Sequence, residues 1–488
     1  MKNRWSLVIH EVSAHTANIW VGTLFADMRK PVKAVVELVN QNGDALQKIE
    51  IAKQDWQRPY RQITSQRFYR LIEVKGLQPG QFYKVVFKEC FDDDNEFNDK
   101  LLSKGSFTTL PYSVNDLVNG FTIGLGSCFY EEYDGGSVST AYETLSKATQ
   151  FPYKPHIKFL SGDQVYLDIG WDSLSVIPKE VRDRVASDYA LQWQALRGVL
   201  RHGGTWFLSD DHEFWNNYPM IEGWSPFIQA LRIPSVKNAW KGTAQDGVMN
   251  IQRVRPVRTF DIGAGANKEV SFCAVDLRAF RTEQNIMSDK HFAGALRWVK
   301  QLTCPGVLVL SQPLMEKYDH KDRNFIFYQR QYGQLLRAIH NANHDIMVLS
   351  GDVHHGRISK VEFPNRTNKL VEVVSSPMSN LSGESSIATS TINIQSRLKR
   401  FPDINVYGVP KVDVQYQSPW KVSTADNFFD FRYWDERTKE HFNTLTLNKL
   451  EDGKLEVTVR AWLVREKDHK TGLPKQDWGE KPMRFVLS

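Results

Sequence analysis

Four short clusters of polar residues each follow a run of apolar residues. They are Gly126-Ser-Cys128, Gly162-Asp163-Gln-Val-Tyr166, Asp210-Asp211-His212-Glu213 and Gly351-Asp352-Val-His354. Taken alone, an Asp-His-Glu run after a strand is more often a helix cap with a satisfied histidine than a reaction centre. A thiol, a phenol, carboxylates and imidazoles gathered in one place would instead form a metal site.

The elements that carry these clusters predict such a meeting. Candidate strands are Phe121–Leu125, Ile157–Leu160, Thr205–Leu208, Val270–Val275, Val307–Leu310 and Ile346–Leu349, and the helical stretches between them are Ser139–Ala148, Lys179–Leu200, Phe292–Leu302 and Asn324–Ala342. Strands that alternate with helices indicate an α/β fold with largely parallel strands. In such sheets the carboxyl ends of the strands open into one crevice, where ligands bind.

The first 110 residues have a different pattern, of short β-rich runs. Ile19–Val21, Val32–Val39 and Tyr83–Phe87 are rich in β-formers, and the last alternates apolar residues with lysine, as a strand with one buried face does. The preceding Leu77-Gln-Pro-Gly-Gln-Phe-Tyr83 resembles the turn before the tyrosine-corner strand of fibronectin type III sandwiches. We therefore expect a small all-β domain over residues 1–112.

The second domain is expected over residues 119–488. Between residues 381 and 429 the chain has many Ser, Asn and Pro without a clean period, which predicts long surface loops at the edge of a cleft. Two β-rich runs around Asp452-Gly453 predict a hairpin near the C-terminus.

Composition excludes several classes of protein. The chain has 488 residues, of which 41% are hydrophobic and 24% charged, so a disordered protein is excluded. A net charge of +6 over this length requires neither nucleic acid nor an anionic membrane as partner. The four cysteines lie far apart, without a C-x-x-C pair, which excludes a disulfide framework and a zinc ribbon. No apolar run reaches the roughly 20 residues that cross a bilayer, and no signal peptide is evident, so we expect a cytoplasmic protein.

In their order along the chain and in their residue types, the four clusters resemble the motifs of the calcineurin-like metallophosphoesterases. The wider superfamily uses D-x-H, G-D, G-N-H-E and G-H-x-H, whereas its PhoD-type alkaline phosphatase/phosphodiesterase branch uses G-S-C, G-D-x-x-Y, D-D-H-E and G-D-x-H. This chain matches the second series from Phe121 to His355, with further similarities at residues 275–281 and 374–379. The resemblance implies a two-sheet β core flanked by helices, with metals at the strand ends.

The resemblance also implies a role for each residue of the clusters. Cys128, Asp163, Tyr166 and His354 would hold the first metal; Asp163 would bridge to a second metal held by Asp211 and Asp352; His212 would lie beside the transferred phosphoryl group. Thiolate, phenolate and imidazole suit iron, in its ferric state because phenolate prefers a high-valent ion, whereas carboxylates suit Ca²⁺, Mn²⁺ or Mg²⁺. The branch uses iron with calcium, in agreement with this ligand chemistry.

The predicted reaction is hydrolysis of a small-molecule phosphoric ester, as a monoesterase, a diesterase or both. Two cations ~3.5–4 Å apart would clamp the phosphate and hold a metal-bound hydroxide as the nucleophile. His212 would stabilise charge on the phosphoryl oxygens and protonate the leaving alkoxide. No covalent phosphoenzyme is expected.

For several nearby residues the sequence allows two different roles. Arg278 is a candidate phosphate ligand, as is Arg281, but structural ion pairs explain both equally well. His355 is expected to support the neighbouring ligand or to line the cleft, without binding metal. Gln312 stands where the superfamily has a histidine for the second metal, so its carbonyl oxygen or a water would take that position. An aromatic stretch after the histidine motif (Phe214, Trp215, Tyr218, Trp224, Phe227 and Trp240) would form a lid or pocket wall, or pack in the ordinary way.

Two other functions stay open from the sequence. One is a non-catalytic binding or scaffold protein that has kept the fold, with the N-terminal domain as its interaction module. The other is a phosphodiesterase specific for a phospholipid or a nucleotide. An incomplete set of metal ligands would favour the scaffold.

Overall fold

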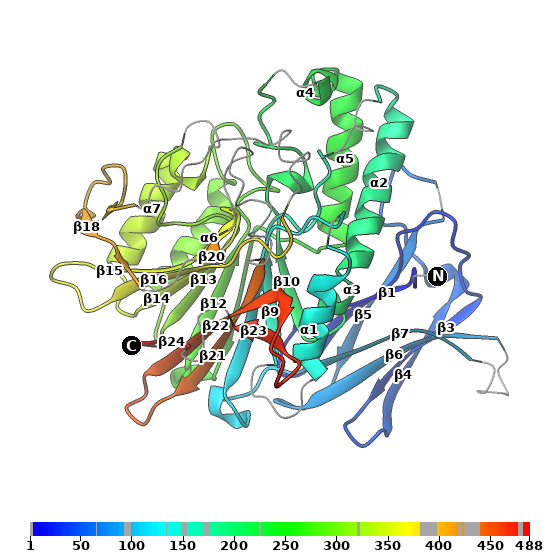
Figure 1. Cartoon of the computed structure of the whole chain (residues 1–488), viewed down its shortest axis with the longest axis horizontal. Coiled ribbons are helices and arrows are strands. Elements are labelled where there is room, and N and C mark those ends of the chain that lie inside the picture. The colour runs from blue at the N-terminus through cyan, green and yellow to red at the C-terminus, as the bar shows by residue number, and fades with distance from the viewer. Residues whose placement is uncertain are drawn as a thin grey trace.

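The structure is a computed structural model. It describes residues 3–64, 66–91, 99–132, 134–147, 154–169, 175–223, 226–319, 323–380, 398–417, 422–423, 440–476 and 482–488. Figure 1 shows the N-terminal strands on one side of the molecule and helices α6 and α7 on the other.

The N-terminal strands form two antiparallel sheets. One is ordered β1 (Ser6–Val12), β2 (Thr16–Thr23), β5 (Phe68–Lys75); the other is ordered β4 (Ala45–Ala52), β3 (Lys33–Val39), β6 (Phe82–Cys90), β7 (Lys100–Thr108). In β6 the side chains of Tyr83, Val85 and Phe87 are buried while Lys84 is exposed. The Tyr83 hydroxyl accepts a hydrogen bond from the backbone N–H of Gln78 at 2.9 Å, the contact that defines a tyrosine corner. The predicted all-β sandwich is confirmed.

The rest of the chain is built on two larger sheets. The first is ordered β10 (Gly204–Leu208), β9 (Ile157–Ser161), β8 (Phe121–Gly126), β21 (His441–Lys449), β22 (Leu455–Lys467), β23 (Pro474–Gln476), and β24 (Met483–Leu487) pairs with β22. Strands β8, β9 and β10 run parallel, and the predicted C-terminal hairpin supplies β21 and β22.

The second sheet contains the remaining predicted strands. Its order is β11 (Val257–Ile262), β12 (Val270–Val275), β13 (Gly306–Leu310), β14 (Ile346–Ser350), β16 (Lys369–Val374), β15 (His355–Glu362), β19 (Gln415–Tyr416), and β20 (Val422–Ser423) pairs with β15. Strands β12, β13, β14 and β16 are parallel, whereas β11 and β15 are antiparallel to their neighbours. The sequence did not identify β11, β15 or β16. A short ladder joins β17 (Arg400–Phe401) to β18 (Val412–Asp413).

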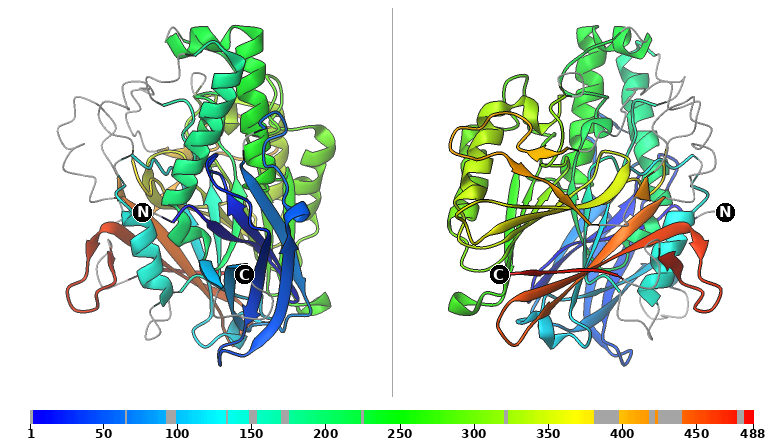
Figure 2. Two further views of the ribbon diagram at one scale, coloured as in Figure 1. Left: turned by 90° about the vertical axis from the view of Figure 1, so that its right-hand side faces the viewer. Right: turned by 60° about the vertical axis from the view of Figure 1, so that its left-hand side comes forward.

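Helices cover the outer faces of both large sheets. They are α1 (Ser137–Lys147), α2 (Pro178–Ala195), α3 (Arg197–Leu200), α4 (Pro226–Leu231), α5 (Pro234–Asn250), α6 (Asp289–Lys300) and α7 (Gln329–His340), with single 3₁₀ turns η1 (Lys53–Asp55), η3 (Val114–Asp116), η5 (Asp211–Glu213), η6 (Gly265–Asn267) and η7 (Phe325–Phe327). In the left view of Figure 2 the N-terminal strands, in blue, come to the front below α2 and α5. No helix in the described ranges is long and apolar enough to cross a membrane.

Three apolar clusters hold these layers together. Between the two large sheets, Phe159 stacks on Phe272 with ring centroids 6.2 Å apart. A second cluster lies beneath α1, α2 and α5, and a third beneath α6 and α7. The resulting helix–sheet–sheet–helix order confirms the predicted fold class. Of the predicted loops at 381–429, residues 381–397, 418–421 and 424–429 lie outside the described residues, and the described part contains β17 to β20.

Candidate metal centre

The four polar clusters lie directly after β8, β9, β10 and β14, at the carboxyl ends of parallel strands in both sheets. Their loops are hydrogen-bonded to one another. The backbone N–H of Cys128 donates to the carbonyl of Gly162 at 3.2 Å, and that of Phe129 donates to the carbonyl of Asp163 at 2.8 Å. Between the two sheets, the backbone N–H of Asp352 donates to Ser127 Oγ at 3.3 Å. The packing of the two sheets therefore brings loops that are far apart in the sequence to one place.

Four of the predicted ligands lie close together, joined through Asp163 Oδ2 and the Tyr166 hydroxyl. Asp163 Oδ2 lies 3.5 Å from Cys128 Sγ and 3.5 Å from the Tyr166 hydroxyl. The Tyr166 hydroxyl in turn lies 3.5 Å from His354 Nε2. Cys128, Asp163 and Tyr166 are buried, so a thiol, a carboxylate, a phenol and an imidazole share one enclosed position.

The other two predicted ligands form an adjoining group. One potential ligand atom from each of Asp210, Asp211 and Asp352 lies within 4.8 Å of the others. The same criterion joins Asp211 to Asp163 and His212. Asp211 thus belongs to both groups, and the six predicted ligands form one continuous cluster. Asp210 was not predicted as a metal ligand. In the described structure its Oδ2 is buried and has no hydrogen-bond partner.

The backbone at these ligands is strained. Cys128, Asp163, Asp352 and His354 have φ angles of 53°, 56°, 70° and 51°, in the left-handed region that residues with a Cβ rarely adopt. Each such residue costs on the order of 1–3 kcal/mol and is usually kept because a function requires its geometry. Four of the six predicted ligands have this conformation, which is typical of residues at a functional site.

Two histidines are oriented by partners that the sequence did not predict. His354 Nδ1 lies 2.7 Å from Asn380 Oδ1, so Nδ1 carries the hydrogen and Nε2 keeps its lone pair toward Tyr166. His212 Nδ1 lies 2.7 Å from Asp168 Oδ1, and its ring stacks on Tyr166 with centroids 4.3 Å apart. The only signals in the sequence were the position of Asp168 two residues after Tyr166 and that of Asn380 after the 374–379 stretch.

Glu213 holds the loops after β9 and β10 together, a role that the sequence did not predict. Its two carboxylate oxygens accept hydrogen bonds from the backbone N–H groups of Asp163 at 2.9 Å, Gln164 at 2.7 Å and Asp210 at 2.8 Å. It therefore ties the loop after β9 to the loop after β10, the two segments that carry Asp163 and Asp211.

The protonation states of the cluster depend on whether a cation is bound. Burial raises the pKa of Cys128 and of Tyr166 well above their usual values, and neighbouring negative charges raise both further. Burial likewise raises the pKa of Asp163, against the opposing charge of His212. Without a metal, these ligands favour their protonated forms; a bound metal ion reverses this preference. Burial lowers the pKa of His354 to about 4, so its imidazole is neutral and able to bind metal. The residues fit a dinuclear metal site.

Solved structures provide an independent comparison. A structure of PhoD aligns over 99% of this chain and 88% of its own, with a TM-score of 0.60 and 16% sequence identity. This chain has the fold of PhoD. A purple acid phosphatase from yellow lupin (Lupinus luteus) seeds covers 99% of this chain and 74% of its own, at 11% identity and a TM-score of 0.49. No family model matches the chain, and no curated protein matches it.

On this PhoD fold, the two arginines are both in structural contacts. Arg278 is 1% exposed; it donates to Asp210 Oδ1 at 2.5 Å, and its Nη2 lies 3.7 Å from Asp211 Oδ1. This placement favours an ion pair over a contact with substrate phosphate. Arg281 is also buried, at 4% exposed. His355 Nδ1 donates a hydrogen bond to the carbonyl of Val353 at 2.7 Å.

The aromatic stretch is packed in the interior. Phe214, Trp215, Tyr218, Phe227 and Trp240 are all buried, and the indoles of Trp215 and Trp240 each donate to a backbone carbonyl at 2.6 Å. Ordinary packing therefore accounts for these five residues. Trp224 lies outside the described residues.

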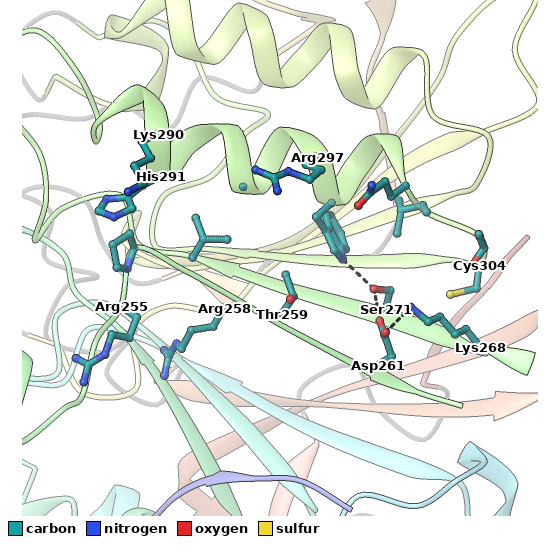
Figure 3. Close-up of a pocket in the computed structure, with 17 residues that line it drawn as sticks. Arg255, Arg258, Thr259, Asp261, Lys268, Ser271, Lys290, His291, Arg297 and Cys304 are labelled. Atoms are coloured by element: carbon teal, nitrogen blue, oxygen red, sulfur yellow. Dashed lines mark hydrogen bonds and ion pairs between the residues drawn. The ribbon is translucent and has the colours of Figure 1, made fainter. Parts of the chain in front are cut away.

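A separate cavity of about 650 Å³ lies between β11 and α6. Figure 3 shows its lining, which includes Arg255, Lys290 and Arg297 together with the Asp261–Lys268 ion pair. None of the four polar clusters contributes to that lining, so this cavity is not the metal centre.

Proposed function

We propose that this protein hydrolyses phosphoric esters at a dinuclear metal centre. The first cation would be held by Cys128, Asp163, Tyr166 and His354; Asp163 would be shared with a second cation held by Asp211 and Asp352. The observation that carries the proposal is the meeting of these six side chains at the strand ends of a PhoD fold.

The ligand types support two different cations. A thiolate and a phenolate beside an imidazole favour iron, in its ferric state because phenolate prefers a high-valent ion. The carboxylates of the second position favour a hard divalent ion, with Ca²⁺ ahead of Mn²⁺ or Mg²⁺. When bound, such cations would neutralise phosphoryl charge and activate a water for attack at phosphorus.

His212 would act on the substrate directly. Burial alone would lower its pKa, but the charges of Asp168 and Asp163 raise that pKa well above its usual value. A protonated imidazole can bind a phosphoryl oxygen and donate its proton to the leaving alkoxide. Because Nδ1 faces Asp168, the proton available to substrate is the one on Nε2.

The two structural parts would have separate roles. We propose that residues 1–112 form a sandwich domain of the fibronectin III type and residues 119–488 the phosphatase domain, because every polar cluster of the metal centre lies in the second range.

The test compares Asp163→Asn with Asp345→Asn. Asp345 is 1% exposed and lies just before β14, at the opposite end of the strand that leads to Asp352, so it controls for loss of a buried carboxylate. The assay is hydrolysis of a panel of chromogenic phosphate mono- and diesters, with elemental analysis of each protein. We expect the wild type and the Asp345→Asn variant to turn over substrate and Asp163→Asn to lose activity and metal.

Either of two results would overturn the proposal: full activity of Asp163→Asn, or a metal-free wild type without activity on any ester. Tyr166→Phe tests the iron separately. A ferric ion bound to a phenolate gives the protein a visible absorption band, and this band should be absent in the variant. An active, colourless wild type would refute ferric iron at the first position.

A further inference from the structure

Gln312 lies between a guanidinium and a predicted metal ligand. It follows β13 and is 2% exposed. Its Oε1 accepts a hydrogen bond from Arg281 Nη2 at 2.9 Å, and its Nε2 donates to Asp352 Oδ2 at 3.2 Å. The side-chain amide therefore connects Arg281 to Asp352.

The orientation of this amide is dictated by its two neighbours. A guanidinium offers only hydrogen-bond donors, and an ionised carboxylate offers only acceptors. Turning the amide over would place N–H against N–H on one side and oxygen against oxygen on the other. The carbonyl oxygen of Gln312 must therefore face Arg281, away from Asp352.

Arg281 is itself fixed in position. Its Nε donates to the carbonyl of Leu277 at 2.8 Å and its Nη1 to the carbonyl of Arg323 at 3.0 Å. The guanidinium also lies over the ring of Tyr328, 5.0 Å from the centroid, and the residue is 4% exposed. With these contacts made, Arg281 holds the Gln312 oxygen and cannot turn toward a substrate.

The neighbouring carboxylate is held in the same way. Asp211 Oδ2 accepts a hydrogen bond from the backbone N–H of Asn217 at 2.7 Å. Each of the two aspartates thus has one oxygen tied to an N–H group. Such outer contacts orient metal ligands, and their loss typically lowers metal affinity about 10–100-fold.

From these contacts we propose that Gln312 is a positioning residue for the second cation and not one of its ligands. The inference rests on the proposed dinuclear centre. Gln312 and Arg281 orient the Asp352 carboxylate. At the position where the wider superfamily has an imidazole, this chain has an amide whose nitrogen donates to Asp352 and does not face the cation. The second position is consequently selective for hard, oxygen-preferring cations such as Ca²⁺ over Zn²⁺, which favours nitrogen and sulfur.

The test measures cation binding without substrate. Full-length wild type, Gln312→Leu, Gln312→His and Arg281→Lys are treated with EGTA and titrated calorimetrically with Ca²⁺ and, separately, with Zn²⁺. Gln331→Leu is the matched control, because Gln331 is also a buried glutamine and binds the backbone of Ile286 and Met287 instead. Circular dichroism confirms that each variant is folded.

We expect the Kd for Ca²⁺ to rise roughly 10–100-fold in Gln312→Leu and to stay unchanged in Gln331→Leu. Gln312→His should shift the preference toward Zn²⁺ by at least about tenfold, because an imidazole is added. If Gln312→Leu does not fold, Gln312→His alone still tests the selectivity.

Arg281→Lys separates positioning from direct ligation. Lysine keeps the charge but cannot hold the amide with a planar fork, so positioning predicts weaker Ca²⁺ binding. Unchanged or tighter binding in this variant, or an unchanged Kd in Gln312→Leu, would overturn the inference. A wild type that binds no divalent cation at all would instead refute the dinuclear centre, so the two failures are distinguishable.

Discussion

The loops of the metal centre depend on Glu213, and its removal makes a quantitative test. In Glu213→Ala, the acceptor is lost by four backbone N–H groups, those of Asp163, Gln164, Val165 and Asp210. The side-chain amide of Gln252, whose Nε2 lies 3.1 Å from Glu213 Oε1, loses it as well. Glu213 is fully buried, so bulk water does not replace it.

The magnitude follows from the number of donors left unpaired. A buried donor without a partner costs about 1–3 kcal/mol, so the four backbone groups together cost about 4–12 kcal/mol. Water entering the space left by the side chain would satisfy some of them, which places the expected loss at about 3–5 kcal/mol. A protein's total stability is typically about 5–15 kcal/mol, so this loss is large but leaves room for folding.

The assay is urea unfolding followed by fluorescence, in EDTA so that bound cations do not stabilise the folded state. Glu466→Ala is the control, since Glu466 is partly exposed and pairs with Lys475 at 2.8 Å. Loss of such a surface pair costs about 1 kcal/mol or less. Glu213→Gln should fall between the two, because its amide keeps one accepting oxygen.

The reasoning is refuted if Glu213→Ala unfolds at the same urea concentration as Glu466→Ala. In that case the bonds to Glu213 would not be what holds the loops after β9 and β10. A further consequence should accompany the loss of stability. Because those loops carry Asp163 and Asp211, Glu213→Ala should also retain less metal at purification.

Three other predictions concern single side chains. Asp168→Asn removes the charge that raises the pKa of His212, so the alkaline limb of the pH–rate profile should move to lower pH; an unmoved limb would exclude His212 as the titrating acid. Asn380→Ala removes the hydrogen bond that orients His354, so the affinity for iron should fall about 10–100-fold in a competition titration with a chelator, and an unchanged affinity would contradict this role. Burial lowers the pKa of His10 to about 3, so its contribution to stability is present above pH ~6.5 and is lost at about 1.4 kcal/mol per pH unit as the pH falls toward 3; His10→Phe should flatten this fall in acid unfolding.

Much of the centre could be predicted from the sequence because its signals are local. A ligand that directly follows an apolar strand is recognisable from neighbours within a few residues, and parallel strands must bring their carboxyl ends to one edge. This is why Cys128, Asp163, Tyr166, Asp211, Asp352 and His354 were predicted from four short motifs. The same locality explains why β15 and β16 were missed, since their apolar and charged residues do not alternate clearly.

The roles of the remaining residues required the tertiary structure. Asp168 and His212 are 44 positions apart, Asn380 and His354 are 26 apart, and Arg278 and Asp210 are 68 apart, so nothing in either segment reveals the partner. Arg278 and Gln312 show the difference most clearly. Their residue types suit a phosphate contact and a metal ligand, but the packing of the two sheets encloses them among groups that already use their polar atoms.

The division has a physical basis. Residue types and their order along each strand determine which chemistry the protein can perform, because donor atoms and hydrophobic periodicity are properties of the chain itself. Which oxygen of an aspartate is free, and which way an amide faces, depends on hydrogen bonds between segments that meet only when the sheets pack. The sequence therefore defined the candidate ligands, and the fold decided how each side chain is held.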